Sequence, residues 1–155
     1  MKKKYFAVLA AAILAGALTT GCSSNAEGMK DGTYRAEMKE ASHGYTDYVE
    51  ITVKNGKIDT VVYDAVADDG KKKSQDEDYK KSMMDGNKNA GLPETYPADY
   101  MKKLGDSLIE KQNADQVDAV AGATTSTNDF KKLVSALKAN MEKGKTETVV
   151  VDNSK

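Results

Sequence analysis

The sequence predicts a small α+β domain, in which an antiparallel sheet with an Asn-Gly hairpin packs against two or three helices. Three observations support this fold class. Segments typical of strands come before segments typical of helices. Apolar residues alternate over Tyr48–Lys54 and are followed directly by Asn55-Gly56, the residue pair most typical of a two-residue hairpin. Further along, apolar residues recur every three or four positions, as in helices that bury one face.

Three strands are expected in the first half of the domain. The first covers Thr33–Met38, the second covers Tyr48–Lys54, and the return strand of the hairpin covers Lys57–Ala65. Side chains two positions apart share one face of a strand. The return strand should therefore present one set of residues together, namely Ile58, Thr60, Val62 and Asp64.

Two helices are expected in the middle of the chain. A short helix over Asp76–Asp85 would turn Tyr79 and Met83 inward, and a longer helix over Pro97–Gln112 would carry Pro97 in its first turn. The inward residues of the longer helix are Tyr100, Met101, Leu104 and Leu108. The charged stretch 68–89 that contains the short helix could be a docking surface or simply a solvated face.

The last helix is expected to begin near Ser126, with a capping box between Ser126 and Asp129, and to end at Gly144. Its buried face would consist of Phe130, Leu133, Val134, Leu137 and Met141. The segment 117–120 before it is either a short strand or an extended entry. The tail 145–155 either adds a last strand through 149–151 or is frayed.

The N-terminus has the parts of a secretory signal. Three lysines precede an apolar run that is too short to cross a bilayer, and Leu18-Thr19-Thr20-Gly21-Cys22 resembles a bacterial lipobox. This resemblance implies cleavage of a lipoprotein signal peptide, residues 1–21, and a palmitate-type lipid anchor on Cys22. The alternative is an ordinary cleaved signal with an incidental cysteine. We therefore expect a protein held at the extracytoplasmic face of the cell membrane, with residues 22–30 as tether, 31–144 as domain and 145–155 as tail.

Composition excludes several classes of function. The 23 basic residues less the three signal lysines leave 20 against 24 acidic residues, a net charge of −4, so there is no basic field for nucleic acid. Cys22 is the single cysteine and His43 the single histidine. With Cys22 lipidated, disulfides, thiolate metal sites and haem attachment are excluded, as are multi-histidine metal sites. Any redox chemistry would need an organic cofactor.

The segment Asp118–Thr127 is the most informative for function. It combines an extended run, a turn at Gly122, four consecutive hydroxyl residues from Thr124 to Thr127, and a helix start. Backbone N–H groups and the positive end of the dipole at a helix start favour a phosphate, and glycine lets a ligand approach the backbone closely. The alternative is a capped helix without a ligand, because serine and threonine are ordinary cap residues.

Residues Asp118–Thr124 resemble the flavinylation motif of the FMN-binding domain family. That family includes peripheral subunits of sodium-pumping and ferredoxin-linked respiratory complexes and small bacterial lipoproteins. Asp118, Gly122, Ala123 and Thr124 match the motif, whereas Ala121 stands where serine or threonine is more usual. Other landmarks of the family follow in order, at residues 31–34, 43–45, 55–58 and 97–104.

The resemblance implies FMN joined through its phosphate to the hydroxyl of Thr124. A separate flavin transferase, dependent on FAD and magnesium, would make the bond, because a threonine hydroxyl needs activation and no histidine lies near Thr124 in the sequence. The cofactor-binding residues expected are Thr124, Asp118, Gly122, Ala123, Thr125, Ser126 and Thr127. Asp118 serves recognition or stabilises the turn. No catalytic residue and no metal site are expected.

Other side chains could contact the flavin ring, although each has a structural alternative. Tyr45, Tyr79, Tyr96 and Tyr100 are candidates, but tyrosines more often serve packing. His43 precedes Gly-Tyr and fits a turn residue, so no catalytic role is assigned to it.

Three functions remain open. The leading one is a lipoprotein electron carrier that takes electrons from a membrane oxidoreductase or the quinol pool and passes them to extracellular acceptors or a partner reductase. The second is a flavin-bearing accessory subunit of an exported reductase. The third is a ligand-binding lipoprotein without a redox role. In the first two the protein transfers electrons rather than acting as a self-sufficient enzyme.

Overall fold

The computed structural model describes residues 28–153. The predicted signal peptide, the lipid site at Cys22 and most of the predicted tether lie outside these residues. Within the described residues, no helix is both long enough and apolar enough to cross a membrane.

Four strands form one sheet in the order β3-β2-β1-β4. They are β1 (Gly32–Met38), β2 (Thr46–Lys54), β3 (Lys57–Val66) and β4 (Val149–Val151). Neighbours β1, β2 and β3 pair antiparallel, but β4 pairs parallel to β1. The prediction of an antiparallel sheet is therefore wrong at this edge. Strand β4 arrives by a helical crossover, the kind of connection that parallel neighbours need, so the predicted tail strand joins the sheet in the direction of β1.

The turn between β2 and β3 consists of Asn55 and Gly56, both with positive φ (52° and 71°), and Lys54 pairs with Lys57. Two residues later the register shifts. Thr52 pairs with Thr60 and Val53 with Ile58, so Asp59 is the extra residue of a β-bulge. A one-residue insertion moves all following side chains to the other face.

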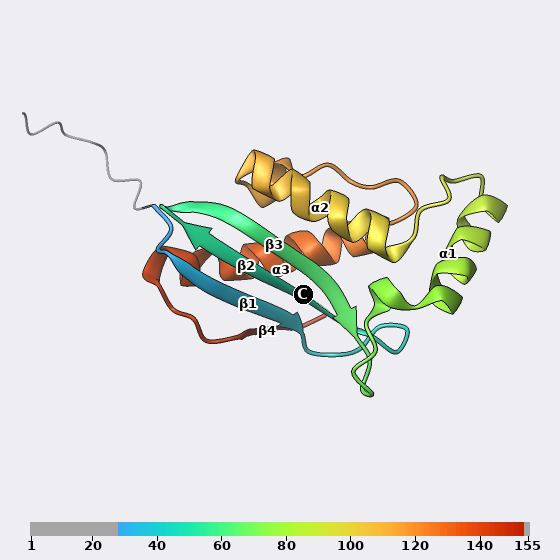
Figure 1. Cartoon of the computed structure of the whole chain (residues 1–155), viewed down its shortest axis with the longest axis horizontal. Coiled ribbons are helices and arrows are strands. Elements are labelled where there is room, and N and C mark those ends of the chain that lie inside the picture. The colour runs from blue at the N-terminus through green and yellow to red at the C-terminus, as the bar shows by residue number, and fades with distance from the viewer. Residues whose placement is uncertain (1–27, 154–155) are drawn as a thin grey trace, which may run out of the picture.

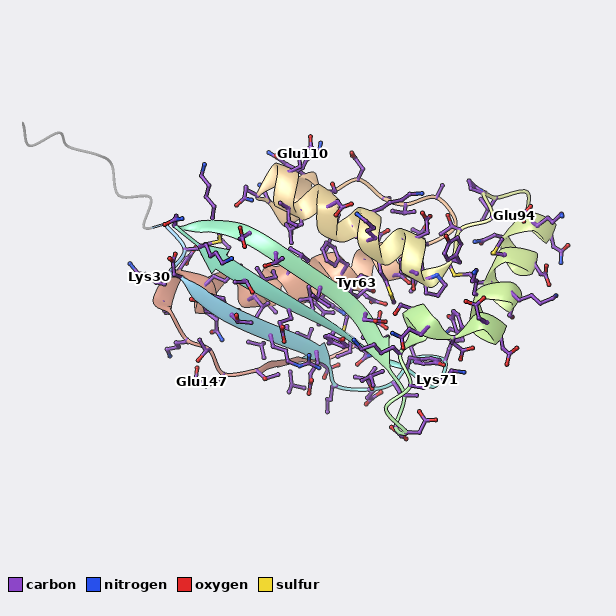
Figure 2. All side chains as sticks on the ribbon, in the orientation of Figure 1. Lys30, Tyr63, Lys71, Glu94, Glu110 and Glu147 are labelled. Carbon is purple, nitrogen blue, oxygen red and sulfur yellow. The ribbon has the colours of Figure 1, made fainter. Side chains whose placement is uncertain are left out.

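The bulge corrects the predicted facing of the return strand. Ile58 is buried as expected, but Thr60 and Val62 are exposed. Tyr63 and Ala65 are buried instead. The tyrosine thereby enters the layer between the sheet and the helices (Figure 2), where it becomes part of the site described below.

Three α-helices complete the fold: α1 (Glu77–Asn89), α2 (Pro97–Lys111) and α3 (Thr124–Lys143). Two short 3₁₀ turns, η1 (Lys73–Gln75) and η2 (Ala114–Gln116), precede α1 and follow α2. Helix α2 packs on β3, while α3 packs on β1 and β2, so both cover the same face of the sheet. Helix α1 stands at one end of the sheet, opposite the end where residue 28 lies (Figure 1).

The core lies between this sheet face and helices α2 and α3. All the predicted inward residues of the last two helices are buried, and the largest fully buried side chains include Tyr34, Ile51, Tyr100, Leu104, Leu108 and Phe130. Gly105 lets α2 lie close to β3, because a Cβ at this position would lie 3.4 Å from the Val61 carbonyl oxygen. Helix α1 contributes no fully buried residue.

Two predicted helix boundaries differ from the structure. Helix α1 runs on to Asn89 rather than ending at Asp85. Helix α3 begins at Thr124, with Ala123 as N-cap, so the predicted capping box between Ser126 and Asp129 is wrong: both residues lie inside the helix. The predicted segment 117–120 is an extended entry and not a strand.

Candidate functional site

The loop before α3 is held by a side chain from the helix itself. The hydroxyl of Thr127 donates to the Ala123 carbonyl oxygen (3.0 Å) and accepts from the Val120 amide (3.2 Å). Thr127 is 1% exposed. Because both bonds bridge the loop and the first helical turn, Thr127 positions the loop from beneath and does not itself face a ligand.

Gly122 is required where the loop meets the C-terminal end of α1. Its φ is +80°, a conformation that side chains disfavour. A Cβ there would lie 2.8 Å from Asn87 Nδ2 and 3.0 Å from the Pro93 carbonyl oxygen. Asn87 Nδ2 donates to the carbonyl oxygens of Gly122 (3.2 Å) and Thr95 (3.3 Å). The glycine therefore allows a close contact that fixes the loop on α1.

A pocket of about 220 Å³ opens in front of this loop. On one side it is lined by the consecutive residues 122–126, which include five of the predicted cofactor-binding residues. Thr124 and Thr125 are exposed there, at the helix end where backbone N–H groups lack helical acceptors. The rest of the lining includes Asp47, Lys73, Tyr79, Met83 and Asp129.

Asp118 lies outside this pocket. Its side chain is 90% exposed, and Oδ2 is 3.9 Å from Lys111 Nζ. The motif aspartate is thus placed on the surface, before the turn that leads to Thr124, where another protein can contact it.

Sequence reasoning missed Asp47, a buried carboxylate in the pocket wall. Asp47 is 6% exposed and is the second residue of β2, on the same strand face as Val49 and Ile51. Its Oδ2 accepts a hydrogen bond from the Tyr63 hydroxyl (2.7 Å), whereas the buried Oδ1 has no partner. Burial raises the pKa of Asp47 above its ordinary value, against the opposing effects of Lys73 and the Tyr63 hydroxyl.

Lys73 supplies positive charge to the same wall. It is 4% exposed, and its Nζ lies 4.7 Å from the centre of the Tyr79 ring and 5.8 Å from that of Tyr45. Such cation–π contacts stabilise an ammonium away from bulk water. Asp129, from α3, also lines the pocket, and burial raises its pKa as well.

Asp76, the N-cap residue of α1, holds Tyr79 and Tyr45 in place beside the pocket. Asp76 accepts hydrogen bonds from the Tyr79 amide (3.0 Å) and from the Tyr45 hydroxyl, and it pairs with Lys71 Nζ (2.8 Å). These bonds hold the pKa of Asp76 well below its usual range, and the bond from Lys71 makes the largest contribution. Tyr45 and Tyr79 stack edge to face, with ring centres 5.7 Å apart.

Of the four tyrosines proposed for flavin contact, Tyr79 alone is among the residues that line the pocket. Tyr45 supports it from behind, and Tyr100 is 1% exposed in the core. Tyr96 lies against Lys80, whose Nζ is 5.0 Å from the ring centre. His43 has a φ of 54°, as expected of a turn residue, yet it lines the pocket. A histidine is therefore near Thr124 in the fold, although none is near it in the sequence.

Comparison with known proteins identifies the family of this chain. Residues 44–138, more than half of the chain, match the family model for the FMN-binding domain. This chain belongs to the FMN-binding domain family. A 15 kDa lipoprotein of Treponema pallidum (strain Nichols) is 36% identical over 97% of this chain and 98% of its own. The crystal structure of the CPE2226 protein from Clostridium perfringens, at 38% identity, covers 80% of this chain and 98% of its own with a TM-score of 0.71.

The pocket suits the FMN that the family binds. A phosphate would meet the start of α3, and Tyr79 and Met83 offer an apolar wall to a flat ring. Asp47 adds a carboxylate to the lining, although its Oδ1 is buried. Pockets that enclose a small molecule usually measure about 300–1,000 Å³, so this one would cover only part of FMN and leave the rest accessible to solvent.

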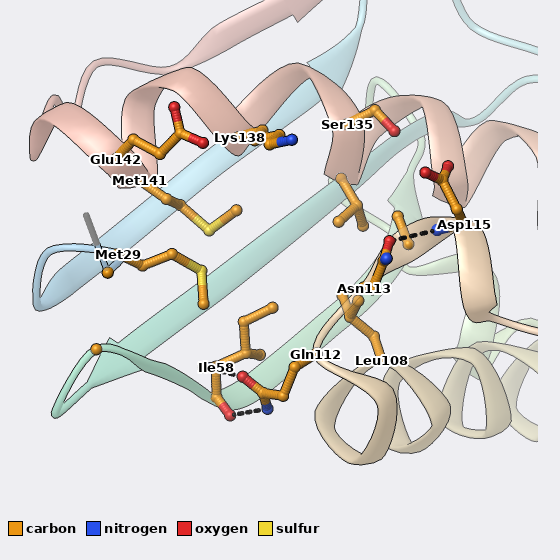
Figure 3. Close-up of a pocket in the computed structure, with 14 residues that line it drawn as sticks. Met29, Ile58, Leu108, Gln112, Asn113, Asp115, Ser135, Lys138, Met141 and Glu142 are labelled. Atoms are coloured by element: carbon orange, nitrogen blue, oxygen red, sulfur yellow. Dashed lines mark hydrogen bonds between the residues drawn. The ribbon is translucent and has the colours of Figure 1, made fainter. Parts of the chain in front are cut away.

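A larger pocket, of about 390 Å³, lies elsewhere and lacks these features. It is bounded by the end of α2, the end of α3 and the hairpin side of the sheet (Figure 3). The Gln112 side chain there bonds the backbone of Ile58 in both directions (2.8 Å each). None of the predicted cofactor-binding residues lines it.

Proposed function

We propose that this member of the FMN-binding domain family is a membrane-tethered electron carrier whose FMN is joined by a phosphoester to Thr124. The lipid on Cys22 would hold it at the extracytoplasmic face, as the similarity to a lipoprotein suggests. Electrons would come from a membrane oxidoreductase or the quinol pool and would pass to extracellular acceptors or a partner reductase.

The observation that carries this proposal is the placement of Thr124. It is the first residue of α3, its side chain is exposed, and it lines the same pocket as Asp47. A phosphate on its hydroxyl would lie beside the positive end of the helix dipole. The motif of the family places its modified residue at the same position.

Attachment would take place on a separate flavin transferase. Thr124 Oγ1 would attack the phosphorus on the FMN side of the FAD pyrophosphate, the bond between the two phosphates would break, and AMP would leave. The hydroxyl proton would pass to a base of the transferase, with magnesium neutralising the phosphate charge. The exposed Asp118 is available to that enzyme for recognition.

The chain's own residues would then hold and orient the cofactor. The close contact of Gly122 with Asn87 holds the loop against α1, and the buried hydroxyl of Thr127 holds it against α3, so the attachment point is supported from two sides. Tyr79 and Met83 would shield one side of the ring from water. Bound FMN supplies the redox chemistry, and the protein supplies placement and charge.

The test is coexpression of residues 22–155 with a flavin transferase, followed by a denaturing gel viewed for flavin fluorescence. We expect wild type to fluoresce and Thr124→Val to stay dark. The neighbouring Thr125→Val is the matched control, because it removes an equally exposed hydroxyl one residue away and should still fluoresce. A dark wild type, or an equally bright Thr124→Val, would contradict covalent attachment at Thr124.

Electron transfer needs a second measurement. Membrane vesicles that carry the lipidated, flavin-loaded protein should reduce soluble ferric iron faster than vesicles that carry Thr124→Val. Equal rates would show that the flavin is not part of this route.

A further inference from the structure

Asp47 is a buried carboxylate that the fold does not fully satisfy. Within residues 28–153, its Oδ1 is the one fully buried side-chain nitrogen or oxygen atom without a hydrogen-bond partner. The nearby Asp64, also buried, differs: it accepts from the Ser74 hydroxyl (2.7 Å), the Ser74 amide (3.2 Å) and the Ala65 amide (2.8 Å). Native structures leave few such atoms unpaired, so this one calls for a physical explanation.

The hydrogen bonds around Asp47 lack one donor. Tyr63 Oη lies 2.7 Å from Asp47 Oδ2 and 3.0 Å from the Ser126 carbonyl oxygen. A tyrosine has one proton to donate, so with Asp47 ionised only one of these two acceptors is fully served. If Asp47 is protonated on Oδ2, it donates to Tyr63, and Tyr63 is then free to donate to Ser126. Both contacts become hydrogen bonds only in the protonated state.

The charges that face Asp47 come from every element around it. Lys73 from η1 lowers its pKa, as does the hydroxyl of Tyr63 from β3, while Asp129 from α3 and Asp64 from β3 raise it. His43, from the loop between β1 and β2, lines the same pocket. Burial outweighs these influences, and the net result is a pKa above that of an ordinary aspartate. A further negative charge placed in the pocket would raise it again.

We propose that Asp47 is the proton-accepting residue of this pocket, taking up one proton when the flavin held there is reduced and releasing it on reoxidation. The inference rests on the proposed function, because it needs the flavin at Thr124. A two-electron donor such as a quinol would give two electrons to the ring and release its two protons to solvent. From solvent, the ring would take one proton at N5 and the carboxylate of Asp47 a second, which makes Asp47 a neutral carboxylic acid. The pocket would then have the same net charge before and after reduction.

The thermodynamic reason is reciprocal linkage. If the charge on the reduced ring raises the proton affinity of Asp47, protonation of Asp47 must favour reduction of the ring by the same factor. The reduction potential should therefore depend on pH through this residue. Each additional proton taken up with two electrons adds about 30 mV to the slope per pH unit.

The experiment measures the reduction potential of the covalently flavinylated protein from about pH 4, near the ordinary aspartate pKa, to about pH 8. Wild type should show a pH interval in which its slope exceeds that of Asp47→Asn by about 30 mV per pH unit. The matched control is Asp129→Asn, which removes another carboxylate that lines the pocket and should keep the wild-type slope. Reduced-minus-oxidised infrared spectra should show a protonated carboxyl band in wild type and Asp129→Asn that Asp47→Asn lacks.

The possible outcomes separate the role of Asp47 from covalent attachment at Thr124. A loaded wild type without a new carboxyl band overturns the role of Asp47, even if Asp47→Asn does not fold, and leaves covalent attachment standing. Equal slopes in wild type and Asp47→Asn do the same. Wild type without flavin overturns the proposed function, and the role of Asp47 with it.

Discussion

Replacement of Gly122 by alanine tests whether the loop before Thr124 is fixed by close packing. Alanine at a φ of +80° costs about 1–2 kcal/mol. The new Cβ would also displace Asn87, whose Nδ2 would be 2.8 Å away, and would break its two hydrogen bonds to backbone carbonyls. At about 0.5–1.5 kcal/mol each, these losses bring the expected total to about 2–5 kcal/mol.

Gly70 offers a matched control for the backbone strain. Its φ is +85°, and a Cβ there would meet nothing within 4 Å. Gly70→Ala should therefore cost only the strain, about 1–2 kcal/mol. The difference between the two variants, about 1–3 kcal/mol, measures the close contacts with Asn87 and with the Pro93 carbonyl oxygen.

Urea unfolding of the unloaded protein, followed by circular dichroism, measures both free energies. In a background that carries Asn87→Ala, the cost of Gly122→Ala should fall by at least about 1 kcal/mol, since contacting residues are energetically coupled. If Gly122→Ala costs no more than Gly70→Ala, the loop adjusts freely and the reasoning about a fixed attachment point is wrong.

Three other substitutions test the surrounding structure. Thr127→Val removes both hydrogen bonds of a buried hydroxyl at nearly constant volume, so urea unfolding should show a loss of about 1–3 kcal/mol. The depressed pKa of Asp76, caused first by Lys71, means that its contribution to stability is complete above about pH 4 and is lost as the pH falls. Wild type should therefore lose more stability on acidification than Asp76→Asn, which unfolding curves at successive pH values would show. Leu104→Ala creates a cavity at a site with no exposed surface and should cost about 2–5 kcal/mol by the same assay.

The fold class and most of its elements could be predicted because the local signals are strong. The four-residue spacing of Leu104 and Leu108 in α2, and of Leu133 and Leu137 in α3, shows which face of each helix is buried. Residues 122–126 line one pocket because they are consecutive. The resemblance to the FMN-binding domain family leads to the same stretch. Local patterns and a family motif were enough for these features.

The other wall of the pocket could not be predicted, because it depends on the register between strands. The bulge at Asp59 reverses the facing of β3, and without it Tyr63 would point away from Asp47. No pattern in the sequence marks that extra residue. Lys73 reads as one of several lysines in a charged stretch, and only the fold shows that it is buried. In the sequence Asp47 is a polar residue directly before the predicted strand. Only the fold shows that it is buried and that its Oδ1 has no hydrogen-bond partner.

The position of the pocket in the domain determines which way it faces. The described chain begins at the end of the sheet that carries the hairpin, and α1 lies at the other end (Figure 1). The pocket lies beside α1, because Tyr79 and Met83 of that helix line it together with His43 from the loop between β1 and β2. The seven residues of β1 alone separate these ends by about 20 Å. A domain anchored through Cys22 and standing upright would thus turn the pocket towards the surroundings. If the protein carries electrons as proposed, the domain would have to reorient to bring the pocket to a donor in the bilayer. Accepting and delivering electrons would then need two orientations of the domain, and the rate of reorientation would set an upper limit on the rate of transfer.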